Sequence, residues 1–342
     1  MEQNTFKWHE LEDGTLMITK YTGQSKEVDI PAVIGSASVT SIGEKAFSEN
    51  KLTMVTIPDG ITEIGDWAFA LNQLTAVTIP DSVTCIGRSA FALNKLKTVT
   101  IPESVSCIGD WAFALNKLNT VTIPNRITAL GEGVFSANKL TAVIIPDSVT
   151  TIGDEAFRAN QLTAVTIPDR ITNIGDWAFA ENKLAVITIP DRVTALGDGA
   201  FEWNQLTALT ISQSVTTIGE EVFRDNKLTT VSIPDRVTLI GKEAFALNQL
   251  TTVTIPDSVT EIGDWAFADN NLTTITIPDN VTKIGKEAFR NNRLIAVVIP
   301  DRVTCIGERA FADNQLTALS IPEGITEIGD EAFYPFQTNT TK

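Results

Sequence analysis

The sequence predicts a repeat protein, a solenoid of about fourteen coils in which short strands alternate with one-turn helices, and three observations support this prediction. Fourteen glycines recur every 22 residues, from Gly43 to Gly329. A phenylalanine follows each of these glycines by four residues, from Phe47 to Phe333. An asparagine closes 13 of the 14 coils, beginning with Asn50. The core of such a chain grows along one axis, because each coil contacts only its neighbours.

The coil that starts at Leu52 shows how the first half of each repeat is expected to form. Leu52, Val55 and Ile57 are the inward positions of a short strand, and Thr56 between them points outward at period two. Pro58 ends this strand, because it has no N–H to donate to a ladder.

The second half of the same coil turns the chain back. Residues 61–64 form a second extended stretch with isoleucine at both ends, and Gly65 permits either a positive φ or a close backbone approach. Residues 66–69 predict one turn of helix. Asn72 then closes the coil, where a buried amide can bridge backbone groups of successive loops. We interpret the asparagine column as a structural ladder.

The run at 74–87, Leu-Thr-Ala-Val-Thr-Ile-Pro-Asp-Ser-Val-Thr-Cys-Ile-Gly, is followed by Ala90, Phe91 and Asn94 and resembles the BspA-like leucine-rich repeat of bacterial surface proteins. Residues 13–23 resemble the entry cap of the same arrays, and the resemblance extends to about residue 334. It implies a curved, right-handed leucine-rich-repeat solenoid of mixed α/β type that binds macromolecules, often as an adhesin or host-contact protein. It implies no catalytic residues.

Three segments are expected along the chain: a hairpin-like N-terminal cap at residues 1–38, the solenoid at 39–333, and a C-terminal cap and tail at 334–342. The cap carries enough apolar residues to cover the first coil. At the other end, Pro335 is expected to stop further strand pairing, and Phe336 to shield the last coil.

Composition excludes several classes of partner. A formal net charge of -16 argues against nucleic acid and against anionic lipid, both of which select basic surfaces. No segment approaches the roughly 20 apolar residues of a membrane span, so we expect no membrane insertion. The family resemblance implies secretion or a cell-surface location, but the first residues show no apolar run like a signal peptide. Location and oligomeric state stay open.

The sequence predicts neither an enzyme nor a cofactor or metal site. His9 is the only histidine, so no His-based triad or metal site can be assembled. Acidic residues follow the strand-ending prolines and alternate with arginines such as Arg126 and Arg192, which we interpret as a solvated salt-bridge fringe. A calcium-binding row is the alternative, although the Gly-Gly-x-Gly-x-Asp signature is absent.

The cysteines are expected to be free thiols. Cys85 and Cys107 lie one period apart and should therefore sit on neighbouring coils, within roughly 5 Å of each other. That separation is within the range of a disulfide, yet side-by-side parallel positions rarely orient correctly for one. Cys305 occupies the same column, nine coils further on.

The outward face of the first strand is the predicted binding surface. Threonine dominates its second and fifth positions and small residues lie between them, so the face is flat, weakly polar and nearly free of charge. We expect a protein or glycan ligand there, including one on a host surface. The structural alternative is that threonine simply stacks well in ladders. The predicted binding residues are Thr163, Thr166, Val186, Thr188, Thr207, Thr210, Thr229, Ile295 and Val298.

Tryptophans provide a second set of candidates. Four of them share one column and the fifth lies on a neighbouring loop; the candidates are Trp67, Trp111, Trp177, Trp265 and Trp203. Exposed tryptophan stacks on sugars or anchors a protein partner. The four in one column are separated by two, three and four coils, so they do not form one patch. The alternative is that each ring lies sideways over the loop of its neighbour.

Two other functions remain open at this point. The chain can be a structural spacer that only holds its ends apart. Regular threonine columns also suggest ice binding, in which hydroxyls and methyls at fixed spacing order water. Near-identical repeats can moreover reflect recent duplication, in which case the regularity carries no functional message.

Overall fold

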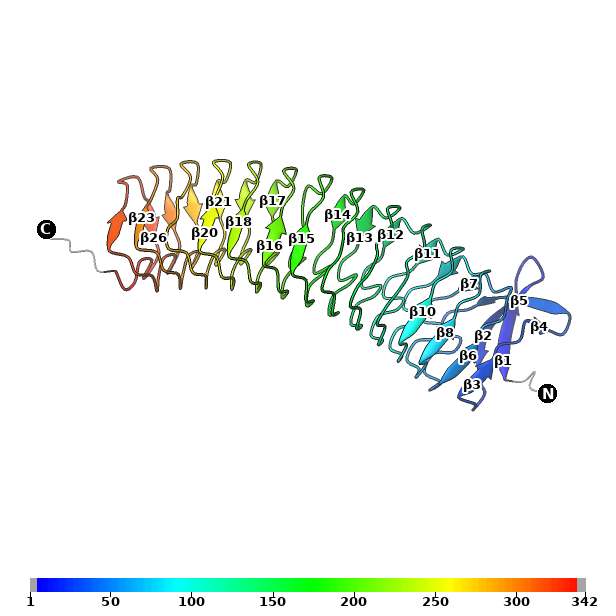
Figure 1. Cartoon of the computed structure of the whole chain (residues 1–342). Coiled ribbons are helices and arrows are strands. Elements are labelled where there is room, and N and C mark those ends of the chain that lie inside the picture. Colours follow the sequence, from blue (N-terminus) through cyan, green and yellow to red (C-terminus); the bar gives the residue numbers. More distant parts are fainter. Residues whose placement is uncertain (1–4, 337–342) are drawn as a thin grey trace. The chain divides into compact units, whose positions relative to one another are not determined.

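The computed structural model describes residues 5–336, which form two compact units, one ending at Arg170 and one beginning at Ile171 (Figure 1). Each unit is a stack of coils with two columns of very short strands, the β-solenoid that the 22-residue period predicts. The ends of the predicted caps, residues 1–4 and 337–342, lie outside the described residues. In the described part of the chain, no helix has the length and apolar character needed to cross a bilayer.

The first unit begins with the strands of the predicted cap. Strand β1 (Phe6–Glu10) pairs antiparallel with β2 (Leu16–Tyr21), and β2 pairs in parallel with β5 (Ala37–Ile42), which also forms a hairpin with β4 (Val33–Ile34). The first column contains β3 (Glu27–Asp29), β6 (Met54–Thr56), β8 (Ala76–Thr78) and β10 (Thr98–Thr100). The second column continues from β5 through β7 (Glu63–Ile64), β9 (Cys85–Ile86), β11 (Cys107–Ile108), β12 (Ala129–Leu130) and β13 (Thr151–Ile152).

The second unit repeats the two columns without a cap of this kind. Its first column contains β15 (Val186–Thr188), β16 (Ala208–Thr210), β18 (Thr230–Ser232), β20 (Thr252–Thr254), β23 (Ala296–Val298) and β25 (Ala318–Ser320). Its second column contains β14 (Asn173–Ile174), β17 (Thr217–Ile218), β19 (Leu239–Ile240), β21 (Glu261–Ile262), β22 (Lys283–Ile284), β24 (Cys305–Ile306) and β26 (Glu327–Ile328). Paired strands within each column are parallel and in register at 22-residue spacing.

The core is a stack of identical side chains. Leu52, Val55 and Ile57 are buried and Thr56 is exposed, which confirms the predicted alternation. Phenylalanine rings stack along each unit, as with Phe69 on Phe91 at 5.2 Å between ring centroids. Parallel, offset stacking of this kind adds about 0.5–1.5 kcal/mol per pair beyond the buried area.

The predicted one-turn helices are not found among the described residues, where the segment after each glycine forms tight turns. Trp67 and Leu71 have positive φ, 57° and 58°, and this left-handed conformation interrupts any helix. The Trp67 N–H donates to Arg88 O at 2.7 Å and the Phe69 N–H donates to Ala90 O at 2.8 Å. These N–H groups therefore bond to the next coil, whereas a helix would use them within the segment.

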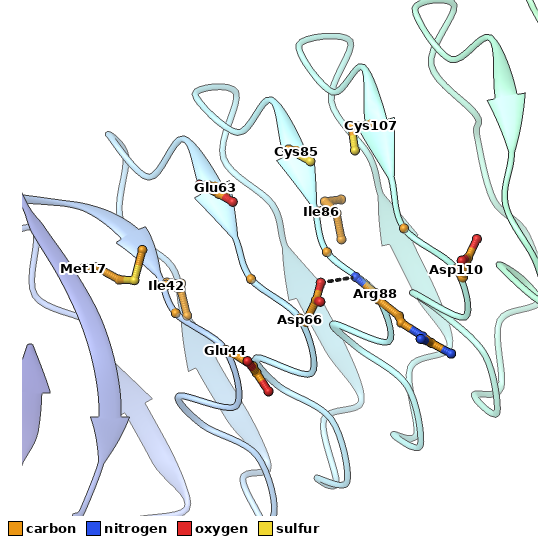
Figure 2. A pocket seen from close by; sticks show the side chains of 14 residues that line it. Met17, Ile42, Glu44, Glu63, Asp66, Cys85, Ile86, Arg88, Cys107 and Asp110 are labelled. Carbon is orange, nitrogen blue, oxygen red and sulfur yellow. Dashed lines mark hydrogen bonds between the residues drawn. The ribbon is translucent and has the colours of Figure 1, made fainter. Parts of the chain in front are cut away.

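The repeat glycine permits close approach of two coils, and this decides between the two predicted roles. A Cβ atom on Gly65 would lie 2.9 Å from Ile42 O and 3.0 Å from Glu44 N of the preceding coil. Real Cβ atoms do not come so close to backbone, so the spacing of the coils requires glycine here. The neighbouring Asp66 carboxylate accepts the Arg88 N–H at 2.7 Å and links this turn to that of the next coil (Figure 2).

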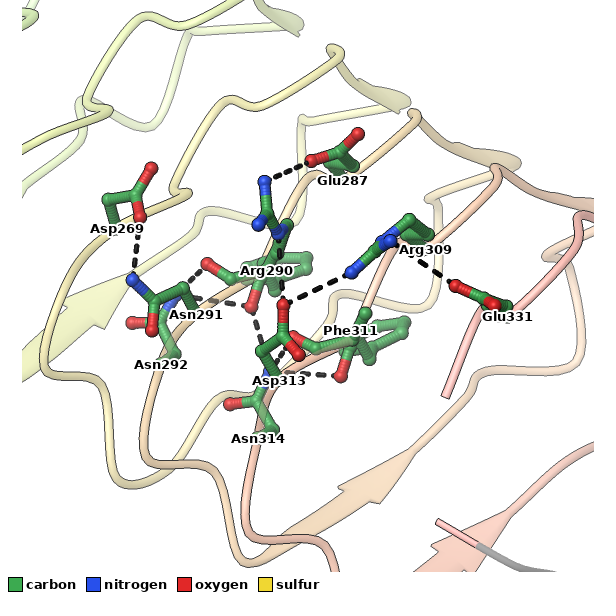
Figure 3. Close-up of polar contacts among 12 residues, drawn as sticks. Asp269, Glu287, Arg290, Asn291, Asn292, Arg309, Phe311, Asp313, Asn314 and Glu331 are labelled. Carbon is green, nitrogen blue, oxygen red and sulfur yellow. Dashed lines mark hydrogen bonds and ion pairs between the residues drawn. The ribbon is translucent and has the colours of Figure 1, made fainter. Parts of the chain in front are cut away.

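The asparagine ladder has the predicted bridging role. The Asn314 Nδ2 group donates to Phe311 O at 3.0 Å within its own coil and to Phe289 O at 2.9 Å in the preceding coil (Figure 3). Its Oδ1 accepts the Leu294 N–H at 2.9 Å. One buried amide thus satisfies backbone groups of two coils, as buried polar groups require.

The series of backbone hydrogen bonds that joins the turns of successive coils ends at Pro335. One coil earlier, the Asp313 N–H donates to Tyr334 O at 2.7 Å, as its equivalents do along the column. Pro335 occupies the next position in this column and has no N–H to continue the series.

Candidate functional site

The first strand column presents an exposed face in each unit, formed by the outward residues of its strands, the residue before each strand, and the equivalent residues of coils in which this column has no strand. We call this the strand face. In the second unit it contains Ala185, Val186, Thr188, Thr207, Ala208, Thr210, Thr229, Thr230, Ser232, Thr251, Thr252, Thr254, Thr273, Thr274, Thr276, Ile295, Ala296, Val298, Thr317, Ala318 and Ser320. All of these residues are exposed, and none carries a charge.

Strand pairing holds these side chains in straight rows. Thr188 lies opposite Thr210 on β15 and β16, and Ser232 lies opposite Thr254 on β18 and β20. Because parallel strands are about 4.7–4.9 Å apart, hydroxyls and methyls repeat at that interval along a row. The strand face is therefore a regular polar and apolar surface on an otherwise acidic chain.

The hydroxyls of the strand face are of two kinds. Threonines just before a strand bond to the backbone of the preceding coil, as Thr207 Oγ1 does to Ala185 O and Thr251 Oγ1 does to Thr229 O, each at 3.3 Å. On β15 and β16, the hydroxyls of Thr188 and Thr210 have no hydrogen bond within the described residues. Hydroxyls at these outward strand positions can thus accept from and donate to a ligand without breaking internal bonds.

Apolar residues interrupt the strand face at a few points. Val298 on β23 is 68% exposed and Ile295, just before this strand, is 52% exposed. On the strand face of the first unit, where the predicted residues Thr163 and Thr166 are also exposed, Ile144 is 84% exposed. Exposed aliphatic side chains next to each other favour contact with a partner.

The tryptophans contact neighbouring turns. A Cβ on Gly133 or on Gly199 would overlap the ring of Trp111 or of Trp177, so each ring lies against the glycine of the next coil. This geometry agrees with the alternative in which the rings lie sideways over adjacent loops. In the sequence, the glycine one period after each of these two tryptophans is the feature that indicates this packing.

Two further tryptophans contact cations. The Trp265 ring lies between the ammonium groups of Lys242 and Lys286, at 5.8 and 5.6 Å from its centroid, and Arg224 is 6.0 Å from the Trp203 ring. Such contacts are worth about 0.5–1 kcal/mol at exposed sites.

Between residues 5 and 336, ion pairs lie on the turns after the repeat glycine and, for Lys283 with Glu261 at 2.6 Å, on the second strand column. None of them joins the acid and arginine columns where we predicted a fringe. Figure 3 shows a chain of them, in which Arg290 bonds Glu287 at 2.8 Å and Asp313 at 3.0 Å. Arg309 then joins Asp313 to Glu331, at 3.3 Å in each case. These carboxylates raise the pKa of Arg290 by accepting its hydrogen bonds. The chain of charges connects successive turns.

Within residues 5–336, no three side chains from His, Cys, Asp and Glu gather in a way that could hold a metal ion. Cys85, Cys107 and Cys305 are free thiols, as predicted.

Comparison with known proteins identifies the repeat. A family model described as the BspA type leucine-rich repeat region, in six copies, matches residues 20–141, 128–249 and 217–340. None of the curated proteins compared with the chain matches it.

Solved structures of bacterial proteins have the same fold. A leucine-rich cell surface protein from Faecalibacterium prausnitzii is 29% identical with a TM-score of 0.60, and a leucine-rich repeat protein from Bacteroides ovatus is 26% identical with a TM-score of 0.64. Each alignment covers 96% of this chain and 90% of the other. The pneumococcal vaccine antigen PcpA, 19% identical with a TM-score of 0.57 over 97% of this chain and 85% of its own, shows likeness of fold alone. The chain therefore belongs to the family of BspA-type leucine-rich repeat proteins.

Proposed function

We propose that this chain is a non-catalytic binding protein that uses its strand face to hold a protein or glycan ligand at a cell surface. The observation that carries the proposal is the contrast between the strand face and the rest of the chain. The strand face of the second unit has no charged residue, whereas the whole chain carries a net charge of -16. A flat face with free hydroxyls and scattered aliphatic groups suits an extended, weakly polar ligand.

The unbonded hydroxyls give this proposal a physical basis. A threonine that served only to stabilise strands could use its hydroxyl internally, as Thr207 and Thr251 do just before their strands. Leaving the hydroxyls of Thr188 and Thr210 exposed costs nothing in water, and it allows hydrogen bonds to a ligand. The cell-surface location is supported by the description of the Faecalibacterium protein, which shares the repeat and the fold.

A screen followed by charge insertion tests the proposal. The chain is immobilised and exposed to extracellular-matrix proteins, mucins and a glycan array. Any ligand that it captures is then measured against the triple variant Thr188→Lys, Thr210→Lys, Ser232→Lys, which places three ammonium groups in one row of the strand face. We expect at least a tenfold loss of affinity, because a flat interface cannot bury three unpaired charges.

The matched control carries the same charges on the second strand column of the same coils, at Thr194, Thr216 and Thr238, which are also exposed. We expect this control to bind normally. Equal binding by both triple variants would refute the use of the strand face. Absence of any ligand in the screen would favour a structural spacer, and thermal hysteresis by the chain would indicate ice binding.

A further inference from the structure

Two cysteine side chains lie side by side on the second strand column of the first unit. Cys85 on β9 is the register partner of Cys107 on β11, and both thiols are free (Figure 2). The Cys85 side chain is half-buried and Cys107 is exposed. Each thiol can therefore be reached from solvent.

The pair lines a pocket of about 590 Å³ on this side of the coils (Figure 2). Glu63, the register partner of Cys85 on its other side, and Asp66 also line the pocket, together with Arg88. The carboxylates attract a cation toward the thiols.

The spacing of parallel strands favours a metal ion bound between the two thiols over a disulfide bond. In-register side chains on neighbouring strands begin about 4.7–4.9 Å apart. A disulfide requires Cβ atoms about 3.8 Å apart, so both strands would have to move together. Two metal–thiolate bonds of about 2.3 Å, the length of a Zn–S bond, span about 4.6 Å when they lie in a line. A single two-coordinate ion fits between the thiols with the strands in place.

We propose that Cys85 and Cys107 form a binding site for a soft monovalent cation that takes two thiolate ligands in a line, namely Cu(I). Thiolates bind soft ions such as Cu(I) and also Zn²⁺, but Zn²⁺ takes four ligands, so a site of two thiolates in a line suits Cu(I). On binding, each thiol releases its proton to water and each sulfur forms one bond to copper. Copper stays in the +1 state throughout, so no electron is transferred and no oxidant is needed.

The protonation of the thiols makes this binding dependent on pH. Burial, and then the hydrogen bond with Cys107, raise the pKa of Cys85 to about 12. The ion must therefore displace a proton that is bound tightly at neutral pH. Apparent affinity should rise as the pH is raised from 6 to 8, because fewer protons compete for the sulfurs.

The test is a titration with Cu(I), held reduced by ascorbate under nitrogen, in competition with the coloured chelator bicinchoninate. We expect the full chain to bind one Cu(I), with the stoichiometry read by native mass spectrometry. Cys85→Ser and Cys107→Ser should each weaken binding at least tenfold, and an unchanged urea midpoint shows that each variant is folded. Binding by Cys85→Ser as tight as that of the unmodified chain would overturn the proposal.

Cys305 supplies the internal control, because its register partners are Lys283 and Glu327 and no second thiol adjoins it. Cys305→Ser should leave Cu(I) binding unchanged. Lys283→Cys recreates a side-by-side pair in the second unit, and this variant should bind a second Cu(I). A variant that still binds only one ion would contradict the geometric argument.

Discussion

Removal of one ladder asparagine tests how the coils are held together. The Asn94 side chain is buried, and its Oδ1 accepts the Leu74 N–H at 3.0 Å. Its Nδ2 group donates to the carbonyl oxygens of Phe69, Phe91 and Ala92 at 2.9, 3.2 and 3.3 Å. Asn94→Ala deletes all four of these bonds.

The four lost hydrogen bonds differ in their cost to the free energy of unfolding. The Leu74 N–H loses its partner and stays buried, which costs about 1–3 kcal/mol. The three carbonyl oxygens each keep another donor: Phe69 O keeps Asn72, Phe91 O keeps Asn116, and Ala92 O keeps the Leu71 N–H. Weakening these three acceptors adds a smaller amount, so we expect a total loss of about 2–4 kcal/mol.

Asn50→Ala is the matched control in the same unit. Asn50 is only half-buried and its Nδ2 group donates to Ser48 O at 2.8 Å, while the Leu52 N–H bonds to Asn72. We expect a loss below about 1 kcal/mol for this variant.

Urea unfolding of both variants, with hydrogen exchange of the peptide that contains Leu74, measures the difference. Hydrogen exchange is included because a repeat array can unfold in parts, which would blur a single urea midpoint. Equal shifts in the two variants, or unchanged exchange at Leu74 in Asn94→Ala, would refute the ladder as the link between coils.

Three further predictions follow from local geometry. Gly133→Ala should lower the free energy of unfolding by about 1–2 kcal/mol and alter Trp111 fluorescence, because Gly133 has a φ of +56° and its Cβ would overlap the ring; an unchanged urea midpoint would contradict this. Iodoacetamide at pH 8 should modify Cys85 very slowly, because a thiol with a pKa of about 12 carries little thiolate at that pH. Rapid labelling of Cys85, measured by peptide mass spectrometry, would contradict this expectation. Phe245→Ala should cost about 3–5 kcal/mol in urea unfolding, because it opens a cavity between two stacked rings, and a loss below 1 kcal/mol would contradict the rigid core.

Most of the fold could be predicted from the period and from the alternation of side chains. Leu52, Val55 and Ile57 are inward because strand geometry forces every second residue to one side. The expected helical turn is not found in the described residues, for a reason that cannot be read from the sequence. Trp67 and Leu71 adopt the left-handed conformation without being glycine, because bonds to the next coil offset its cost.

The candidate site could be predicted only in part. Exposure of Val186 and Val298 follows from their outward positions on the strands. Some threonine hydroxyls bond to the backbone of the preceding coil and others do not, depending on how far the side chain lies from that coil. The spacing of residues along the sequence does not reveal this distance. The packing of the Trp111 ring on the next coil could have been predicted from the sequence, since Gly133 follows Trp111 one period later.

The most direct test of the central claim is a hydrogen-exchange footprint of the chain with the best ligand from the screen. If the strand face binds the ligand, amide protection should increase in strands of the first column, such as β15 (Val186–Thr188) and β16 (Ala208–Thr210). The second column in the same coils, such as β17 (Thr217–Ile218), should be unchanged. Protection confined to the second column or to the tryptophan turns would contradict the account.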